Sequence, residues 1–234
     1  MDANIVAGLK AVSTATLTTV LLKRGIRNAY IRGPKPFCHA TERLVGPAFT
    51  LRFVPMREDL ATPASWGNPI STRAAIEAMP EGVVCVAGAE GVTNAGIFGD
   101  ILVCRMKIRK VAGLVTDGVM RDAPGVDSAG LPVWCSGNAA PASVAGLTFV
   151  GWQEPIGCGG TAVFPGDVIV ADRDGAVVVP QAIAAEVAAE AAAQEAFEDW
   201  ALSEVFRGVP LPGLYPPNEE TKKRYEAFSA GKDS

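Results

Sequence analysis

Histidine is nearly absent from this chain, and its scarcity excludes several kinds of chemistry. His39 is the only histidine among 234 residues, and it follows a Gly-Pro-Lys-Pro-Phe loop. A Ser-His-Asp or Cys-His site would need His39 at its centre, and no nucleophile elbow is present in the sequence. Zinc enzymes also use more imidazole than this. We therefore expect His39 to have a structural or surface role.

Paired metal-ligand cysteines are absent as well. The five cysteines are odd in number and scattered: Cys38, Cys85, Cys104, Cys135 and Cys158. No two have the spacing of a metal-ligand pair, so we expect buried, reduced thiols. Reduced thiols are typical of a reducing compartment, which favours a cytoplasmic location.

The chain also lacks a basic stripe and a long apolar run. Its net charge is −4 and its pI is about 5.2, so nucleic-acid binding has little electrostatic support. No apolar run is long enough to cross a bilayer, and the start of the sequence lacks the charged region of a signal peptide. We expect neither nucleic acid nor a membrane among its partners.

The first part of the chain alternates short apolar runs with segments of helical periodicity. Helices are predicted at residues 5–23, 71–79 (with Ser71 as N-cap) and 97–109, and strands at residues 46–54, 83–87, 112–116 and 131–135. A loop with two prolines and one glycine, residues that interrupt helices and strands, covers residues 62–69. This alternation favours an α/β core.

The second part of the chain has a different pattern. Successive short strands are predicted at residues 147–152, 161–164, 168–172 and 175–179, the last two forming a hairpin. An Ala-rich helix follows from residue 181 to about 206, and a Pro-rich tail begins at Gly208. We predict one domain over residues 1–234, with a core at about 10–180 and the C-terminal helix and tail at 181–234. The tail is expected to wrap a surface or a neighbouring subunit.

Two glycine-rich loops raise the question of a nucleotide cofactor. Residues 88–96 lie between a predicted strand and a helix, and residues 157–160 lie between strands. Neither loop matches a dinucleotide fingerprint or a P-loop. The sequence therefore argues against a nucleotide cofactor and against an adenosyl-methionine methyltransferase.

The most informative pattern is Asp100 followed, after twenty residues, by Arg121 and Asp122. The intervening segment is predicted as helix then strand, which returns its two ends to the same edge of a sheet. Two carboxylates and a guanidinium would then meet, where a hard divalent cation and an anionic substrate could both bind. The alternative is that Asp100 caps a helix while Arg121 and Asp122 form surface ion pairs.

Neighbouring residues strengthen the first interpretation. Gly99 permits a close backbone approach, and the amides of Ile101 and Leu102 would lie at a helix N-terminus, which favours a carboxylate. Arg121 offers planar, two-pronged recognition of a carboxylate. No strong candidate for a Schiff-base lysine is present, since Lys107 is predicted on an exposed helix face.

This spaced motif, preceded by Gly-Leu-Val-Thr-Asp-Gly, resembles one protein family. It contains the class II 4-hydroxy-4-methyl-2-oxoglutarate / 4-carboxy-4-hydroxy-2-oxoadipate aldolases and the regulator of ribonuclease activity A. The likeness covers roughly residues 10–230 and extends through Gly-Pro-Ala-Phe-Thr at 46–50 and Asp-Arg-Asp-Gly-Ala-Val-Val-Val-Pro at 172–180.

The resemblance implies a layered αββα sandwich, similar to swivelling phosphohistidine domains, assembled as a homotrimer or homohexamer. It implies a lyase that uses Mg²⁺ or Mn²⁺ to cleave a 4-hydroxy-2-oxo acid to pyruvate and a second oxo acid, with oxaloacetate decarboxylation as a further activity. By position, Asp122 would hold the metal and Asp100 would orient metal-bound water. Arg121 would bind the oxo acid, aided by Gly99 and the amides of Ile101 and Leu102.

Two other functions remain open from the sequence. The chain could be a non-catalytic regulator that binds a ribonuclease or helicase, since the regulators share much of the motif. It could also be an oligomeric binding module for a small carboxylate. The glutamates of the late helix are interpreted mostly as a solvated face, and the sequence does not identify an acidic residue contributed by a neighbouring subunit.

Overall fold

The computed structural model describes residues 2–40 and 42–231. Its helices and strands, in chain order, are α1 (Ala3–Ala11), α2 (Thr14–Lys23), β1 (Tyr30–Ile31), β2 (Lys35–Cys38), β3 (Leu44–Pro55), η1 (Pro63–Gly67), α3 (Thr72–Ala78), β4 (Val84–Gly88), α4 (Asp100–Ile108), β5 (Gly113–Thr116), α5 (Ala123–Ala129), β6 (Val133–Cys135), η2 (Ser143–Ala145), β7 (Leu147–Trp152), β8 (Ile156–Cys158), β9 (Thr161–Val163), β10 (Val168–Ala171), β11 (Ala176–Val179), η3 (Gln181–Ile183), α6 (Ala184–Phe206) and α7 (Glu219–Ala230).

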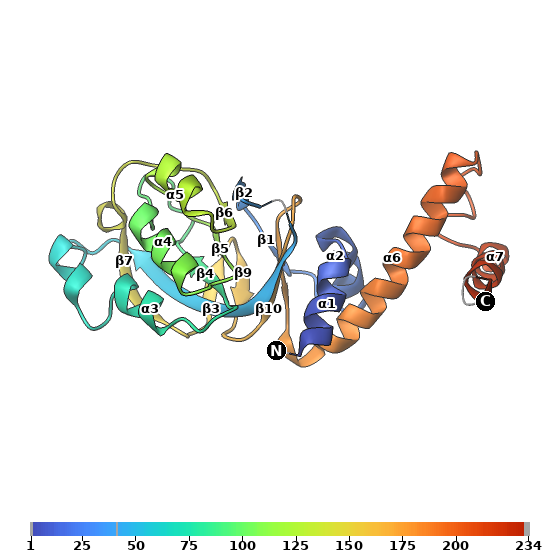
Figure 1. The fold of residues 1–234 in the computed structure, drawn as a ribbon, viewed down its shortest axis with the longest axis horizontal. Helices are drawn as coiled ribbons and strands as arrows, with labels where there is room; N and C mark the ends of the chain where they lie inside the picture. Colours follow the sequence, from blue (N-terminus) through green and yellow to red (C-terminus); the bar gives the residue numbers. More distant parts are fainter. Residues whose placement is uncertain (1, 41, 232–234) are drawn as a thin grey trace.

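One large, curled sheet organises the domain (Figure 1). Across the described residues its nine strands follow the order β1-β11-β10-β3-β4-β5-β6-β2, with β7 also paired to β3. Strands β3, β4, β5 and β6 are parallel, whereas β10 and β11 form the predicted antiparallel hairpin. The long strand β3 belongs to both parts: residues 44–47 pair with β10 and residues 48–52 pair with β4.

Three buried clusters separate four layers, which confirms the predicted αββα sandwich. Alternate residues of each strand contribute to different clusters, because side chains along a strand point to opposite faces. Cys85 of β4 packs toward α3, α4 and α5, and its neighbour Val86 packs toward the middle of the sandwich. Ile169 of β10 also packs into the middle, while Val170 packs against α1, α2 and α6. Burial on both faces explains why these strands read as continuous apolar runs.

The predicted helix at residues 5–23 is wrong as a single helix. Val12 is extended (φ −110°, ψ 147°), and the Ser13 side chain accepts a hydrogen bond from the Thr16 amide, which starts α2 as a separate helix. The capping bond outcompetes continuation of the helix because Ser satisfies an otherwise orphaned amide. Within the described residues no single helix is long and apolar enough to cross a bilayer; α1 and α2 reach that length only together, and they bend by 106°.

Several elements lie outside the sequence predictions. The short strands β1, β2 and β8 were not expected, and each has only two to four residues. The Pro-rich tail contains a helix, α7, whose N-cap Asn218 accepts a hydrogen bond from the Thr221 amide. Ser71 caps α3 as predicted, through a bond from the Ala74 amide.

Helix α6 extends past α1 and α2 and carries α7 at its far end, away from the sheet (Figure 1). We call residues 197–230 the C-terminal arm. The arm has a small core of its own, centred on Trp200 and Leu214, and a buried carboxylate, Glu204, which pairs with Arg224 of α7 and, at 2.8 Å, with Arg207. The arm is therefore a folded unit at the edge of the domain.

Candidate active site

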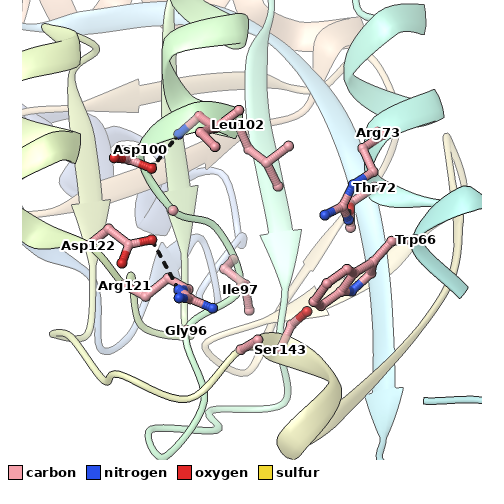
Figure 2. A pocket seen from close by; sticks show the side chains of 13 residues that line it. Trp66, Thr72, Arg73, Gly96, Ile97, Asp100, Leu102, Arg121, Asp122 and Ser143 are labelled. Atoms are coloured by element: carbon pink, nitrogen blue, oxygen red, sulfur yellow. Dashed lines mark hydrogen bonds and ion pairs between the residues drawn. The ribbon is translucent and has the colours of Figure 1, made fainter. Parts of the chain in front are cut away.

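A cleft of about 440 Å³ opens where β4 and β5 lead into α4 and α5. The carboxyl ends of parallel strands are the usual place for polar ligand sites in α/β sheets. One wall carries Asp100, Arg121 and Asp122, and the other carries Trp66 and Arg73 (Figure 2).

The first wall forms because two segments far apart in sequence run side by side. The Ile97 amide donates to the Val119 carbonyl at 2.9 Å, and the Arg121 amide donates to the Phe98 carbonyl at 2.9 Å. These bonds bring Asp100 beside Arg121 and Asp122, as predicted from their spacing. The predicted start of the helix at residue 97 is wrong, because residues 96–98 take part in this pairing and α4 begins at Asp100.

Glycines allow the two segments to approach closely. A Cβ atom at Gly99 would lie 2.3 Å from Oδ2 of Asp122, and one at Gly125 would lie 2.6 Å from Cβ of Asp100. Each carboxylate therefore occupies space that a side chain on the opposite segment would take. The prediction that Gly99 permits close approach is confirmed in this structural sense, and Gly125 has the reciprocal role.

Asp122 has an uncommon backbone conformation. Its φ of 54° and ψ of 43° are left-handed, and it stands at the N-cap position of α5. Aspartate tolerates this region better than most residues, but the conformation still stores strain of a kind that occurs at functional sites. Nε of Arg121 donates to Oδ2 of Asp122 at 3.1 Å, and the two side chains are 35% and 42% exposed. Both groups are thus held at the cleft surface, where a ligand can reach them.

Asp100 occupies the first turn of α4, and Gly99 is the N-cap residue. Oδ1 of Asp100 accepts a hydrogen bond from the Ile101 amide at 2.7 Å, so this amide is already occupied by the protein's own carboxylate. The Leu102 amide belongs to the same helical turn, and the Leu102 side chain lines the cleft. The alternative that Asp100 caps the helix is wrong, because Gly99 is the N-cap residue, although Asp100 binds the adjacent Ile101 amide and faces the cleft. The other half of that alternative, an ion pair between Arg121 and Asp122, is correct.

The donor chemistry of this wall fits a hard divalent cation. The described residues contain no group of three or more His, Cys, Asp or Glu side chains able to enclose a metal. Mg²⁺ does not require such a cage, because it keeps several waters and commonly binds through one or two carboxylates plus the substrate. Asp122 and Asp100 supply two such carboxylates on a shared wall of the cleft.

Sequence reasoning missed the opposite wall. Trp66 lies in η1, within the segment predicted only as a loop, and Arg73 lies in the first turn of α3. The guanidinium carbon of Arg73 is 4.8 Å from the centre of the Trp66 ring. An aromatic residue inside a long polar loop is the only sequence signal that could have indicated this wall.

Asp117 is a further residue whose role the sequence did not assign. It is buried, and its carboxylate accepts hydrogen bonds from the amides of Ala89 (2.7 Å), Gly91 (3.2 Å) and Gly159 (3.0 Å). These bonds join both glycine-rich loops to the end of β5. The Asp117 carboxylate therefore holds both glycine-rich loops in place.

The other candidate residues have ordinary surroundings. The exposed ring of His39 lies with Nε2 2.6 Å from the Asp127 carbonyl oxygen, and Lys107 is exposed, as predicted. The prediction of buried thiols is wrong for Cys104, which is exposed on α4, and correct for the other four cysteines. Burial raises the pKa of the Cys38 thiol to about 11.

The glutamates of α6 are only partly a solvated face. Arg24, the C-cap residue of α2, binds Glu186 at 2.8 Å and Glu190 at 2.6 Å, which holds the pKa of the Glu190 carboxyl below its usual range. Glu195 accepts a bond from the Ser13 amide, and Glu198 from the Tyr215 hydroxyl. These contacts fasten α6 to α2 and to the tail, which the sequence alone did not indicate.

The layered α/β fold and the acidic, arginine-bearing cleft define a class of sandwich proteins with a polar site at the ends of parallel strands. A family model described as RraA-like, Aldolase/RraA, matches residues 14–178. The chain belongs to this family, as the resemblance predicted.

The names of similar proteins indicate two different functions. A protein of Halalkalibacterium halodurans named "Putative 4-hydroxy-4-methyl-2-oxoglutarate aldolase" is 36% identical over 141 residues, which are 60% of this chain and 61% of that protein. The match thus spans about three fifths of that relative's length. The crystal structure of Streptomyces coelicolor RraAS2, described as an unusual member of the RNase ES inhibitor RraA protein family, is 39% identical with a TM-score of 0.77. The match covers 86% of this chain and 96% of the RraAS2 chain.

A third comparison extends the fold match. An uncharacterized protein from Pseudomonas syringae pv. tomato is 27% identical, with a TM-score of 0.77, and the match covers 92% of this chain and 98% of that chain. The family thus contains proteins named as aldolases and proteins named as ribonuclease inhibitors, and the activity of this chain has to be argued from its own site.

Proposed function

We propose that this protein is a divalent-metal-dependent lyase that cleaves a 4-hydroxy-2-oxo acid to pyruvate and a second oxo acid, and that it also decarboxylates oxaloacetate. One observation carries the proposal: the carboxylates of Asp100 and Asp122 and the guanidinium of Arg121 share one wall of a cleft large enough for a small organic acid. An anion-binding residue beside two carboxylates suits a metal ion and a 2-oxo acid together.

The proposed roles follow from the chemistry of each group. Asp122 holds Mg²⁺ or Mn²⁺, and Asp100 orients water beside it. When bound, the metal supplies Lewis-acid charge that stabilises the enolate oxygen of pyruvate. Arg121 binds the carboxylate or carbonyl oxygen of the oxo acid and adds a second positive charge there.

The bond changes require no lysine or histidine. In the aldol cleavage the C3–C4 bond breaks, its electron pair passes to the pyruvate fragment as an enolate, and the proton of the C4 hydroxyl passes through a water oriented by Asp100 to C3 of that enolate, which gives pyruvate. Oxaloacetate loses carbon dioxide to give the same enolate, which takes a proton from water at C3. The exposed Lys107 and the surface His39 stay outside this scheme.

We also propose that the protein assembles as a homotrimer or homohexamer. The C-terminal arm exposes large apolar side chains, including Phe206 (83% exposed), Leu211 (57%) and Leu202 (54%). Apolar surface concentrated on a projecting unit is typical of a protein interface. Assembly would also give a second chain the opportunity to contribute to the cleft.

A regulatory function is the second candidate, supported by the 39% identity to RraAS2, which is described as a member of an RNase inhibitor family. In that case the chain would bind a ribonuclease or helicase and would need no turnover.

The deciding experiment measures pyruvate release from oxaloacetate and from a panel of 4-hydroxy-2-oxo acids. We expect release with Mg²⁺ or Mn²⁺ and its loss on addition of a chelator. A folded, metal-supplied protein that releases no pyruvate from any of these acids would contradict the lyase proposal and favour the regulator.

A further inference from the structure

Arg73 differs from the other arginines near the cleft because it has no acidic partner. Within the described residues the only hydrogen bond of its guanidinium is a long one, from Nη1 to the Thr72 hydroxyl at 3.4 Å. Arg105 of α4 and the C-cap residue Arg109, by contrast, both pair with Glu77 of α3, at 2.7 and 3.2 Å. Arg73 is half-buried, and this burial lowers its pKa from the ordinary value. A partly desolvated guanidinium without a carboxylate is a cost to the fold unless a ligand offsets it.

The surroundings of Arg73 hold its guanidinium in place and leave its donors available. The Trp66 ring lies 4.8 Å from the guanidinium carbon, a cation–π arrangement that orients the group without using its N–H donors. A guanidinium has five such donors in a fixed fork, and the bond to Thr72 uses one. The remaining donors are suited to a planar, two-oxygen acceptor such as a carboxylate.

Arg73 and Arg121 face the same cleft from opposite walls (Figure 2). Arg121 is bound to Asp122, whereas Arg73 forms no ion pair with a described acidic residue. The cleft thus has one end with two carboxylates and a paired arginine, and another end with an unpaired arginine beside an indole ring. The two ends of the cleft are therefore suited to bind different parts of one ligand.

We propose that Arg73, held by Trp66, is a specificity-determining residue that binds a second carboxylate of the substrate, at the end remote from the oxo group. This inference rests on the proposed lyase function and deepens it, because it assigns the residue that distinguishes a dicarboxylic 2-oxo acid from a monocarboxylic one. The carbon chain between the two acid groups lies along the cleft, with the Trp66 ring as apolar surface beside it.

Binding of matched acids tests this without requiring turnover. Isothermal titration with Mg²⁺ present compares 2-oxoglutarate with 2-oxopentanoate, which have five carbons each and differ in the second carboxylate. Because charge-assisted hydrogen bonds contribute about one to two orders of magnitude in affinity, wild type should bind 2-oxoglutarate about 10- to 100-fold more tightly. In Arg73→Met this ratio should fall close to one, and Arg73→Lys should restore part of it.

Arg105→Met is the matched control, since it removes an exposed arginine that pairs with Glu77 outside the cleft lining. It should leave the ratio unchanged. Equal affinity of wild type for the two acids would overturn the proposal. So would an Arg73→Met variant that weakens both acids by the same factor, because a general structural effect does not distinguish them.

Turnover separates this inference from the lyase proposal. The corresponding cleavable pair is 4-hydroxy-2-oxopentanedioate and 4-hydroxy-2-oxopentanoate, compared through kcat/KM for pyruvate release. Selective binding of 2-oxoglutarate with no turnover of either compound would refute the lyase function and still support the role of Arg73. Turnover of both compounds at equal efficiency by wild type and Arg73→Met would keep the lyase and refute the role of Arg73.

Discussion

Replacing Gly99 by alanine should disable the candidate active site without unfolding the protein. The added Cβ would lie 2.3 Å from Oδ2 of Asp122, so this carboxylate has to move by about 1 Å to reach ordinary contact. The backbone itself does not oppose the change, because Gly99 is extended (φ −113°, ψ −174°) and alanine adopts this conformation. Asp122 is 42% exposed, so its side chain can turn toward solvent.

The expected loss of turnover is large, whereas the expected loss of thermal stability is small. A displacement of about 1 Å in a catalytic group can lower turnover about 100-fold. Added bulk at a close contact costs about 1–3 kcal/mol, offset by about 0.4–1 kcal/mol from the smaller entropy of the unfolded alanine chain. For a chain of this size each kcal/mol shifts Tm by about 2–4 °C, so Tm should fall by less than about 10 °C.

The assay is pyruvate release from oxaloacetate, with Mn²⁺ titrated for wild type and Gly99→Ala, alongside thermal melting. Gly157→Ala is the control, because a Cβ there meets no atom within 4 Å. It should change neither activity nor metal affinity. Unaltered turnover and Mn²⁺ affinity in folded Gly99→Ala would refute the assignment of Asp122 to the metal.

The remaining predictions concern the site, the arm and the thiols. Asp122→Asn and Arg121→Ala should each lower turnover about 10²–10³-fold. Asp122→Asn should weaken metal affinity, and Arg121→Ala should chiefly weaken substrate binding. Lys107→Ala, at an exposed position, should change little, and full activity in folded Asp122→Asn would reject the site. Light scattering should report a trimer or hexamer at micromolar concentration. Phe206→Asp should weaken this assembly, because the wild-type side chain is apolar and 83% exposed. A monomeric wild type would contradict the proposed assembly. Of the five thiols, Cys104 should react first with an aromatic disulfide reagent in the native protein, since it is exposed and the other four are buried; unchanged fast reaction in Cys104→Ser would contradict this.

The layers of the fold follow closely from local sequence patterns. The continuous apolar runs of β4, β5, β10 and β11 predict buried strands because both faces of each strand are covered. The break between α1 and α2 was missed because a period of apolar residues continues across Ser13, and only the capping bond reveals the boundary. The strands β1 and β2 were missed because short edge strands depend on long-range pairing, which local periodicity does not encode.

The candidate site was predicted on one side only. Asp100, Arg121 and Asp122 could be found because a helix-and-strand unit with a fixed number of residues returns to the same sheet edge. Trp66 and Arg73 could not, since their place opposite Arg121 depends on how residues 56–71 fold back over the cleft. That loop has few regular elements, and its path is determined by tertiary packing, not by periodicity.

The double pairing of β3 has a consequence for the order of events during synthesis. Its second part finds its partner β4 about 35 residues later, but residues 44–47 pair with β10, more than 120 residues further along the chain. As the chain emerges N-terminus first, the buried cluster that α1, α2 and one end of β3 share with β10, β11 and α6 stays incomplete until those later elements are made. Contacts of such large sequence separation close slowly. The N-terminal helices, although made first, are thus among the last parts of this protein to acquire their native neighbours.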